Sequence, residues 1–243
     1  MLGTRIAQIH KEAKQIYGAP KITRILRKEG EVVSEKLVGN IMRELGLKAH
    51  YAKPWTKTTK DCDFSNQLVN VLKRDFNPIA PNRLWCTDIT YIWTQNDGFV
   101  YLTSVMDLYS RKIIAWTLSK QIVADKVLIC LKVAQTLRYM DKAIVIHSDR
   151  GSQYVSKRYR ELTRNMTLSY SDKAEPWDNA PIEAFHAIIK REWLNRQTIY
   201  NYEHAHSFVF EFIEGFYNTQ RIHSFCGFMS PNEYEKQFLK LTT

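Results

Sequence analysis

The first 47 residues place apolar side chains at the three-to-four-residue period of amphipathic helices. The pattern predicts three short helices that end near Gly18, Gly30 and Gly46, because glycine commonly terminates helices. Pro20 suits the first turn of the second helix, and Ser34 can cap the third. Three such helices bury their apolar stripes against one another, so we expect a compact all-α bundle over residues 1–47.

The period changes after Pro78 and Pro81, where aromatic and β-branched residues predict strands. Asp97-Gly98 is a favoured hairpin pair and is expected to join the first two strands in an antiparallel meander. The order predicts an α/β domain with a mixed five-stranded sheet. The predicted strands are 84–94, 99–107, 112–118, 143–146 and 167–171, and the predicted helices are 124–140, 156–165, 181–195 and 203–219.

Charged residues are distributed unevenly along the chain. Of 35 Lys and Arg against 25 Asp and Glu, 13 basic and 5 acidic residues fall within the first 60 positions, which therefore carry +8 of a formal +10. An excess of positive charge favours a polyanionic partner. Because this excess is concentrated in the segment that contains the helical bundle, it favours DNA bound by a helix-turn-helix. The alternatives are a solvated basic surface and a helical cap without a DNA role. We divide the chain into residues 1–47, a basic linker at 48–77, and residues 78–243.

No apolar run approaches the ~20 residues that span a bilayer, and the first residues lack the apolar core of a signal peptide. The four cysteines are scattered without a CxxC pair, which favours free thiols in a reducing cytoplasm, although a disulfide pair stays open. We therefore expect a cytoplasmic protein.

Three carboxylates mark a candidate active site. Asp88 lies inside an apolar strand, Asp149 directly follows the buried strand 143–146, and Glu183 begins the helix at 181–195. If the first and fourth strands are neighbours, the two aspartates lie side by side and the helix can bring Glu183 to them. Oxygen ligands without His or Cys suit Mg²⁺ or Mn²⁺, and two such ions can clamp a phosphodiester.

Each carboxylate also has a plainer interpretation. Asp88 could be exposed or paired with an arginine, Asp149 could cap the turn before Gly151, and Glu183 could interact with the helix dipole. Lys190 follows Glu183 by two helical turns and shares its face with His186, so it could hold a phosphate beside the metal site or be a solvated lysine. Further DNA-binding candidates are Arg150, Arg191, Lys36 and Arg43.

The chain resembles the second-reading-frame transposases of the IS-three family of insertion sequences, and its core is similar to retroviral-type integrases. The segments that carry this resemblance are WCTDITYI, HSDRGSQYVS, WDNAPIEAFHAIIK, YNTQRIHSFCGFMSPNEY and the N-terminal YGAPKITRILRKEG. The resemblance implies an RNase H-like fold and a DDE catalytic and metal-binding triad of Asp88, Asp149 and Glu183. It also implies Mg²⁺ as cofactor, DNA cleavage at element ends, and joining by the freed 3′-hydroxyl.

The resemblance implies element-end and target DNA as partners, a homo-oligomer on DNA, and an upstream-frame product that supplies a further helix-turn-helix. Between Asp149 and Glu183 stand 33 residues, where the family usually has thirty-five. This shortening leaves a second hypothesis open, in which a truncated or catalytically impaired transposase only binds DNA. A third hypothesis is an RNase H-like nuclease that does not join strands.

Overall fold

A computed structural model describes residues 1–50, 68–138, 143–173 and 175–242. Its N-terminal helices are α1 (Leu2–Glu12), α2 (Ala19–Lys28) and α3 (Glu35–Glu44), which pack against one another. The Ser34 hydroxyl accepts a hydrogen bond from the Leu37 N–H at 3.1 Å, so the predicted cap is confirmed.

The first helix is shorter than the sequence pattern indicated. It ends at Glu12 because Lys14 and Gln15 adopt left-handed φ angles of 56° and 62°, which reverse the chain before Gly18 is reached. Ile16 lies in the loop that follows this helix, and its side chain is buried there.

Five strands form one mixed sheet, as expected, and the structure shows their order to be β3-β2-β1-β4-β5. The long strands β1, β2 and β3 make the antiparallel meander, whereas β4 and β5 add to it in parallel. β4 begins and ends two residues later than predicted, so its last residue directly precedes Asp149. The strands are β1 (Leu84–Thr94), β2 (Gly98–Asp107), β3 (Lys112–Ser119), β4 (Val145–Ser148) and β5 (Thr167–Tyr170).

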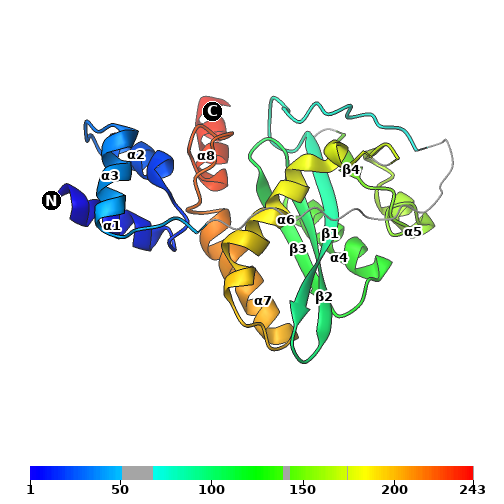
Figure 1. Ribbon diagram of the computed structural model, residues 1–243. Coiled ribbons are helices and arrows are strands. Elements are labelled where there is room, and N and C mark those ends of the chain that lie inside the picture. The colour runs from blue at the N-terminus through cyan, green and yellow to red at the C-terminus, as the bar shows by residue number, and fades with distance from the viewer. Residues whose placement is uncertain (51–67, 139–142, 174, 243) are drawn as a thin grey trace.

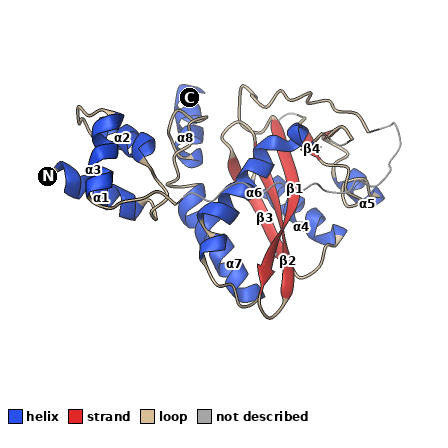
Figure 2. Ribbon diagram, viewed as in Figure 1, coloured by secondary structure: helices blue, strands red, loops and turns tan. Residues whose placement is uncertain are grey.

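Helices cover both faces of this sheet (Figures 1 and 2). α4 (Ala124–Leu137) and α5 (Lys157–Leu162) lie on one face, and α6 (Ala180–Glu192) and α7 (Tyr202–Phe210) lie on the other. Neighbouring side chains of β1 point to opposite faces, so that Trp85 packs in the core with α4 and Cys86 in the core with α6. The sheet is thus the middle of three layers.

Short and irregular helices complete the domain. The 3₁₀ turns η1 (Pro176–Asn179) and η2 (Leu194–Arg196) flank α6, and α7 continues as the π-helical segment η3 (Glu211–Tyr217), where we expected one regular helix. The sequence pattern did not single out α8 (Pro231–Thr242). This helix is anchored by Glu235, whose carboxylate accepts hydrogen bonds from Ser110 and Arg138, and by Tyr234, whose ring stacks on Tyr109.

The helical bundle packs against the α/β domain, and one apolar core runs through both. The Tyr17 hydroxyl accepts a hydrogen bond from the Ile222 N–H at 2.9 Å, and Arg196 donates to the Lys14 carbonyl at 2.7 Å. Residues 51–67 of the predicted linker lie outside the described residues. Beyond them the chain joins the α/β domain, because the Tyr170 N–H donates to the Val69 carbonyl at 3.0 Å.

Two expectations from composition, on the cysteines and on membrane-spanning helices, can be compared with the described residues. Cys86, Cys130 and Cys226 are buried free thiols, while Cys62 lies outside these ranges. Among the helices that the structure describes, none combines the length and the apolar character needed to cross a bilayer.

Candidate active site

Parallel pairing of β1 with β4 brings the two aspartates together. Leu84 pairs with Val145 and Cys86 with His147. The same register, extended by two residues, sets Asp88 level with Asp149. The first and fourth strands are neighbours, which is the condition under which the sequence places the two aspartates side by side.

Asp88 lies on the face of β1 that α6 covers, and its side chain is only 18% exposed. His186 of α6 places its Nδ1 3.4 Å from Asp88 Oδ2 and its Nε2 3.4 Å from the Ser104 hydroxyl on β2. A carboxylate inside an apolar strand needs such polar neighbours. The sequence suggested that Asp88 is either exposed to solvent or paired with an arginine. In the structure its polar neighbour is an imidazole.

Asp149 follows β4 and turns the chain. Its Oδ1 accepts a hydrogen bond from the Gly151 N–H at 2.9 Å, so the turn-capping interpretation is correct for that oxygen. A Cβ on Gly151 would lie 3.0 Å from the same oxygen and 2.8 Å from Gln153 Oε1. Glycine therefore allows the carboxylate to approach the main chain closely.

Glu183 stands in the first turn of α6, on its exposed side. Partial burial of its carboxyl, then the negative charges of Asp88 and of Asp149, raise the pKa of Glu183 to about 7. The two aspartates are thus close enough to Glu183 for their charges to raise its pKa, and each carboxylate adds to the negative potential at the others.

The donor chemistry of this trio fits a hard divalent cation. Its oxygen-only ligands match Mg²⁺ or Mn²⁺, and a cation would relieve the repulsion that raises the pKa of Glu183. Within the described part of the chain, no three His, Cys, Asp or Glu side chains form a ready-made metal cluster.

Lys190 and Arg191 lie near the end of α6, about two turns beyond Glu183. The Lys190 ammonium lies 4.1 Å from the ring centroid of Tyr91, which follows Asp88 by three residues on β1. Arg191 folds back along its own helix, because its Nε donates to the Ala187 carbonyl at 3.1 Å. The lysine is therefore held at the strand that carries Asp88.

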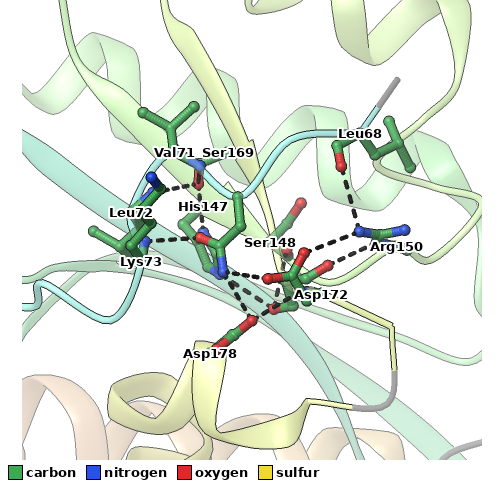
Figure 3. A network of polar contacts seen from close by, with 12 residues as sticks. Leu68, Val71, Leu72, Lys73, His147, Ser148, Arg150, Ser169, Asp172 and Asp178 are labelled. Carbon is green, nitrogen blue, oxygen red and sulfur yellow. Dashed lines mark hydrogen bonds and ion pairs between the residues drawn. The ribbon is translucent and has the colours of Figure 1, made fainter. Parts of the chain in front are cut away.

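Arg150 is engaged inside the protein (Figure 3). Its Nε donates to the Ser171 carbonyl at 2.7 Å and its Nη2 to the Leu68 carbonyl at 3.3 Å, and it pairs with Asp172 at 3.4 Å. Its side chain is 16% exposed. These contacts favour a role in positioning the chain next to Asp149 over a direct contact with DNA.

Lys36 and Arg43 lie on the exposed side of α3, while Val38 and Met42 face the bundle. Arg43 donates to the Asn40 side-chain oxygen at 3.1 Å. Both cations lie on the N-terminal bundle and the three carboxylates lie in the α/β domain, so we assign the two cations to binding.

Two site residues received no role from the sequence. Asp178 and Asn179 precede α6, are buried at 2% and 3% exposure, and make side-chain hydrogen bonds. The signal available was a polar Asp-Asn pair directly before an apolar helix, within the segment WDNAPIEAFHAIIK.

Family models match along most of the chain. The model described as HTH-like domain matches residues 2–55, and two models described as Integrase core domain match residues 78–175 and 164–231. The chain is 34% identical to the transposase for insertion sequence element IS904 of Lactococcus lactis subsp. lactis (strain IL1403), over 97% of this chain and 94% of that protein. It is 35% identical to the transposase InsF for insertion sequence IS3A of Escherichia coli (strain K12), over 93% of this chain and 79% of that protein.

A solved structure shares the fold. A chain in the cryoEM structure of the simian T-cell lymphotropic virus intasome in complex with PP2A regulatory subunit B56 gamma superposes with a TM-score of 0.52. It is 14% identical, and the match covers 95% of this chain and 74% of that one. The expected RNase H-like architecture, preceded by a helix-turn-helix-like region, is confirmed. On these sequence matches the chain belongs to the IS3 family of insertion-sequence transposases.

Proposed function

We propose that this transposase is catalytically active, and that it cleaves DNA at the ends of its insertion element and joins the freed 3′-hydroxyl to target DNA. The observation that carries the proposal is the placement of Asp88 and Asp149 in one parallel register, together with a Glu183 whose pKa responds to both. Despite the shortened interval before Glu183, the charges of Asp88 and Asp149 both raise the pKa of this carboxyl, which supports its place beside them. This favours chemistry over the hypothesis of a protein that only binds DNA.

In this proposal Asp88, Asp149 and Glu183 hold Mg²⁺ or Mn²⁺. When bound, such ions supply Lewis-acid stabilisation of the charge that develops on a phosphodiester during hydrolysis and transesterification. The protein contributes orientation. His186 holds the Asp88 carboxylate from the helix, Gly151 admits the Asp149 carboxylate to the main chain, and Lys190 offers a cation to a phosphate beside the trio.

DNA is the proposed partner of both parts of the chain. The N-terminal bundle supplies the excess positive charge, with Lys36 and Arg43 on the exposed side of α3. Acting on two element ends requires at least two protomers, so we propose a homo-oligomer on DNA, in the bacterial cytoplasm where such DNA resides. The upstream-frame product stays a prediction.

A cleavage and strand-transfer assay on DNA that carries the element ends tests this proposal. The parent should act only with Mg²⁺ or Mn²⁺, and Asp88→Asn, Asp149→Asn and Glu183→Gln should each abolish both steps without loss of DNA binding. Asp125→Asn, an exposed aspartate on α4, is the matched control and should behave as the parent. Undiminished cleavage by any of the three variants would show that the trio is not the active site.

A further inference from the structure

A segment before the sheet, Leu68–Asp75, lies along the edge strand β5, and we name it the strap. The Ser169 hydroxyl on β5 accepts hydrogen bonds from the Val71 N–H at 3.0 Å and the Leu72 N–H at 3.1 Å (Figure 3). The strap thus covers an edge whose polar groups would otherwise be unpaired. The strap lies within the predicted linker, residues 48–77, and attaches this part of the linker to the α/β domain.

The strap contains a strained turn. The Asn70 side-chain oxygen accepts a hydrogen bond from the Lys73 N–H at 2.9 Å. Lys73 and Arg74 then adopt left-handed φ angles of 46° and 65°. Such a conformation is uncommon in residues with a Cβ and persists where surrounding contacts stabilise it. The turn is therefore a feature that other contacts hold in place.

Those contacts converge on Asp178 of η1. Asp178 Oδ1 accepts from Arg74 Nε at 2.6 Å, and its Oδ2 accepts from Asn70 Nδ2 at 2.8 Å. The same Oδ2 also accepts from the Asp172 N–H at 2.8 Å (Figure 3). Arg74 also donates from Nη2 to Glu175 at 2.7 Å. Charge-assisted hydrogen bonds with fixed donor geometry hold both partners in orientation as well as in contact.

Asn179, the residue after Asp178, contacts β1, the strand that carries Asp88. Asn179 is 3% exposed, and its Nδ2 lies 3.5 Å from the Thr87 carbonyl, directly before Asp88. The segment η1 is thus attached to the strap by Asp178 and to β1 by Asn179. Glu183 follows four residues later in α6, so the position of η1 sets where the helix and its carboxylate begin.

We infer that the strap positions Glu183 through the pair Arg74–Asp178, with Asn70 as a second donor, so that these are positioning residues of the active site. The inference rests on the proposed function for its catalytic consequence. The helix itself is held by apolar side chains, since Ile182, Phe185 and Ile189 are at most 1% exposed. Loss of Arg74 should therefore release η1 while α6 stays packed.

Full-length Arg74→Ala and Asn70→Ala are the test variants, with Lys73→Ala as the control. Lys73 stands in the same turn and carries the same charge as Arg74, and its side chain is exposed. The turnover rate on element-end DNA should fall by roughly 10- to 100-fold in the Arg74 variant, as for other residues that orient metal ligands. The Mn²⁺ concentration for half-maximal activity should rise, and DNA affinity and the control should match the parent.

Amide hydrogen exchange supplies a readout that is independent of activity. Peptides that cover η1 and the start of α6 should exchange several-fold faster in Arg74→Ala than in the parent, while peptides from β1 and β2 should not change. Arg74→Lys keeps a donor that can reach Asp178 and should recover part of both the rate and the protection. A role confined to overall stability would not give this local change or this recovery.

The outcomes separate the two proposals. Unchanged exchange at η1 in Arg74→Ala would overturn the positioning role, as would faster exchange with an unchanged rate and Mn²⁺ requirement. A parent protein that does not cleave end DNA would overturn the proposed function instead. In that case the exchange measurement still decides whether the strap holds η1.

Discussion

The imidazole of His186 contacts side chains of two neighbouring strands, with Nδ1 3.4 Å from Asp88 Oδ2 on β1 and Nε2 3.4 Å from the Ser104 hydroxyl on β2. The side chain is 7% exposed. His186 follows Glu183 by one helical turn, so it joins the helix that carries one carboxylate to the strand that carries another. We therefore expect the spacing between these two carboxylates to depend on this contact.

His186→Ala should therefore reduce cleavage by roughly 10- to 100-fold, the effect usual for residues that orient a metal ligand. The physical reason is that Asp88 loses the group that fixes its rotamer. Cleavage rates against Mn²⁺ concentration measure the effect, with His204→Ala, an exposed histidine on α7, as the control. Equal rates in both variants would show that Asp88 keeps its orientation without the imidazole.

Lys190→Ala should weaken binding to element-end DNA and leave Mn²⁺ binding intact, because an ammonium donates hydrogen bonds and cannot coordinate a cation. The slope of log affinity against log salt concentration should fall by about 1, the value for one phosphate contact. Filter binding and calorimetry with Mn²⁺ measure the two properties. Glu183→Ala should show the reverse pattern.

Lys132→Ala is the matched control for Lys190, since this lysine is exposed on α4, on the opposite face of the sheet. If Lys190→Ala binds DNA as tightly as Lys132→Ala, the contact with Tyr91 would be structural and the phosphate would need another cation.

The double variant Lys36→Ala/Arg43→Ala should weaken DNA binding across sequences and reduce the salt slope by about 2, because each cation that contacts a phosphate releases roughly one counterion. Both side chains lie on the exposed side of α3, so the fold should be unaffected. Titrations at several salt concentrations measure the slope. An unchanged slope would indicate that the helical bundle meets DNA through another face.

His223 should make the protein sensitive to acid. Burial, then the nearby cations of Arg221, Lys21 and Arg111, lower the pKa of His223 to about 2. The unfolded chain takes up this proton at about pH 6.5. The stabilisation from a neutral His223 is thus complete above pH 6.5 and is lost as the pH falls towards 2, with a slope of up to about 1.4 kcal/mol per pH unit.

Urea unfolding of the parent and of His223→Gln between pH 7.5 and 4.5 should give a shallower pH dependence of the unfolding free energy in the variant. His147, whose pKa burial lowers to about 4, contributes in the same direction in both proteins. The difference between the two curves therefore reports His223 alone. Parallel pH dependences of the unfolding free energy in the two proteins would contradict the assignment of this acid sensitivity to His223.

The sequence by itself determined the local elements and the candidate carboxylates. Strand β1 has the bounds that its pattern predicted, and Asp97-Gly98 makes the expected turn into β2. Such features follow from side-chain periodicity and backbone preference, which act over a few neighbouring residues. For the same reason the sequence located Asp149 at the end of a buried strand and Glu183 in the first turn of a helix.

Only the tertiary structure decided which distant groups meet. The pairing of β1 with β4, the contact of His186 with Asp88, and the engagement of Arg150 with two main-chain carbonyls join segments far apart in the chain. Besides apolar contacts, the strap and α8 each make a buried polar contact, Asn70 with Asp178 and Ser110 with Glu235. No apolar period announces such contacts, because a polar group is buried wherever the rest of the fold brings it a partner.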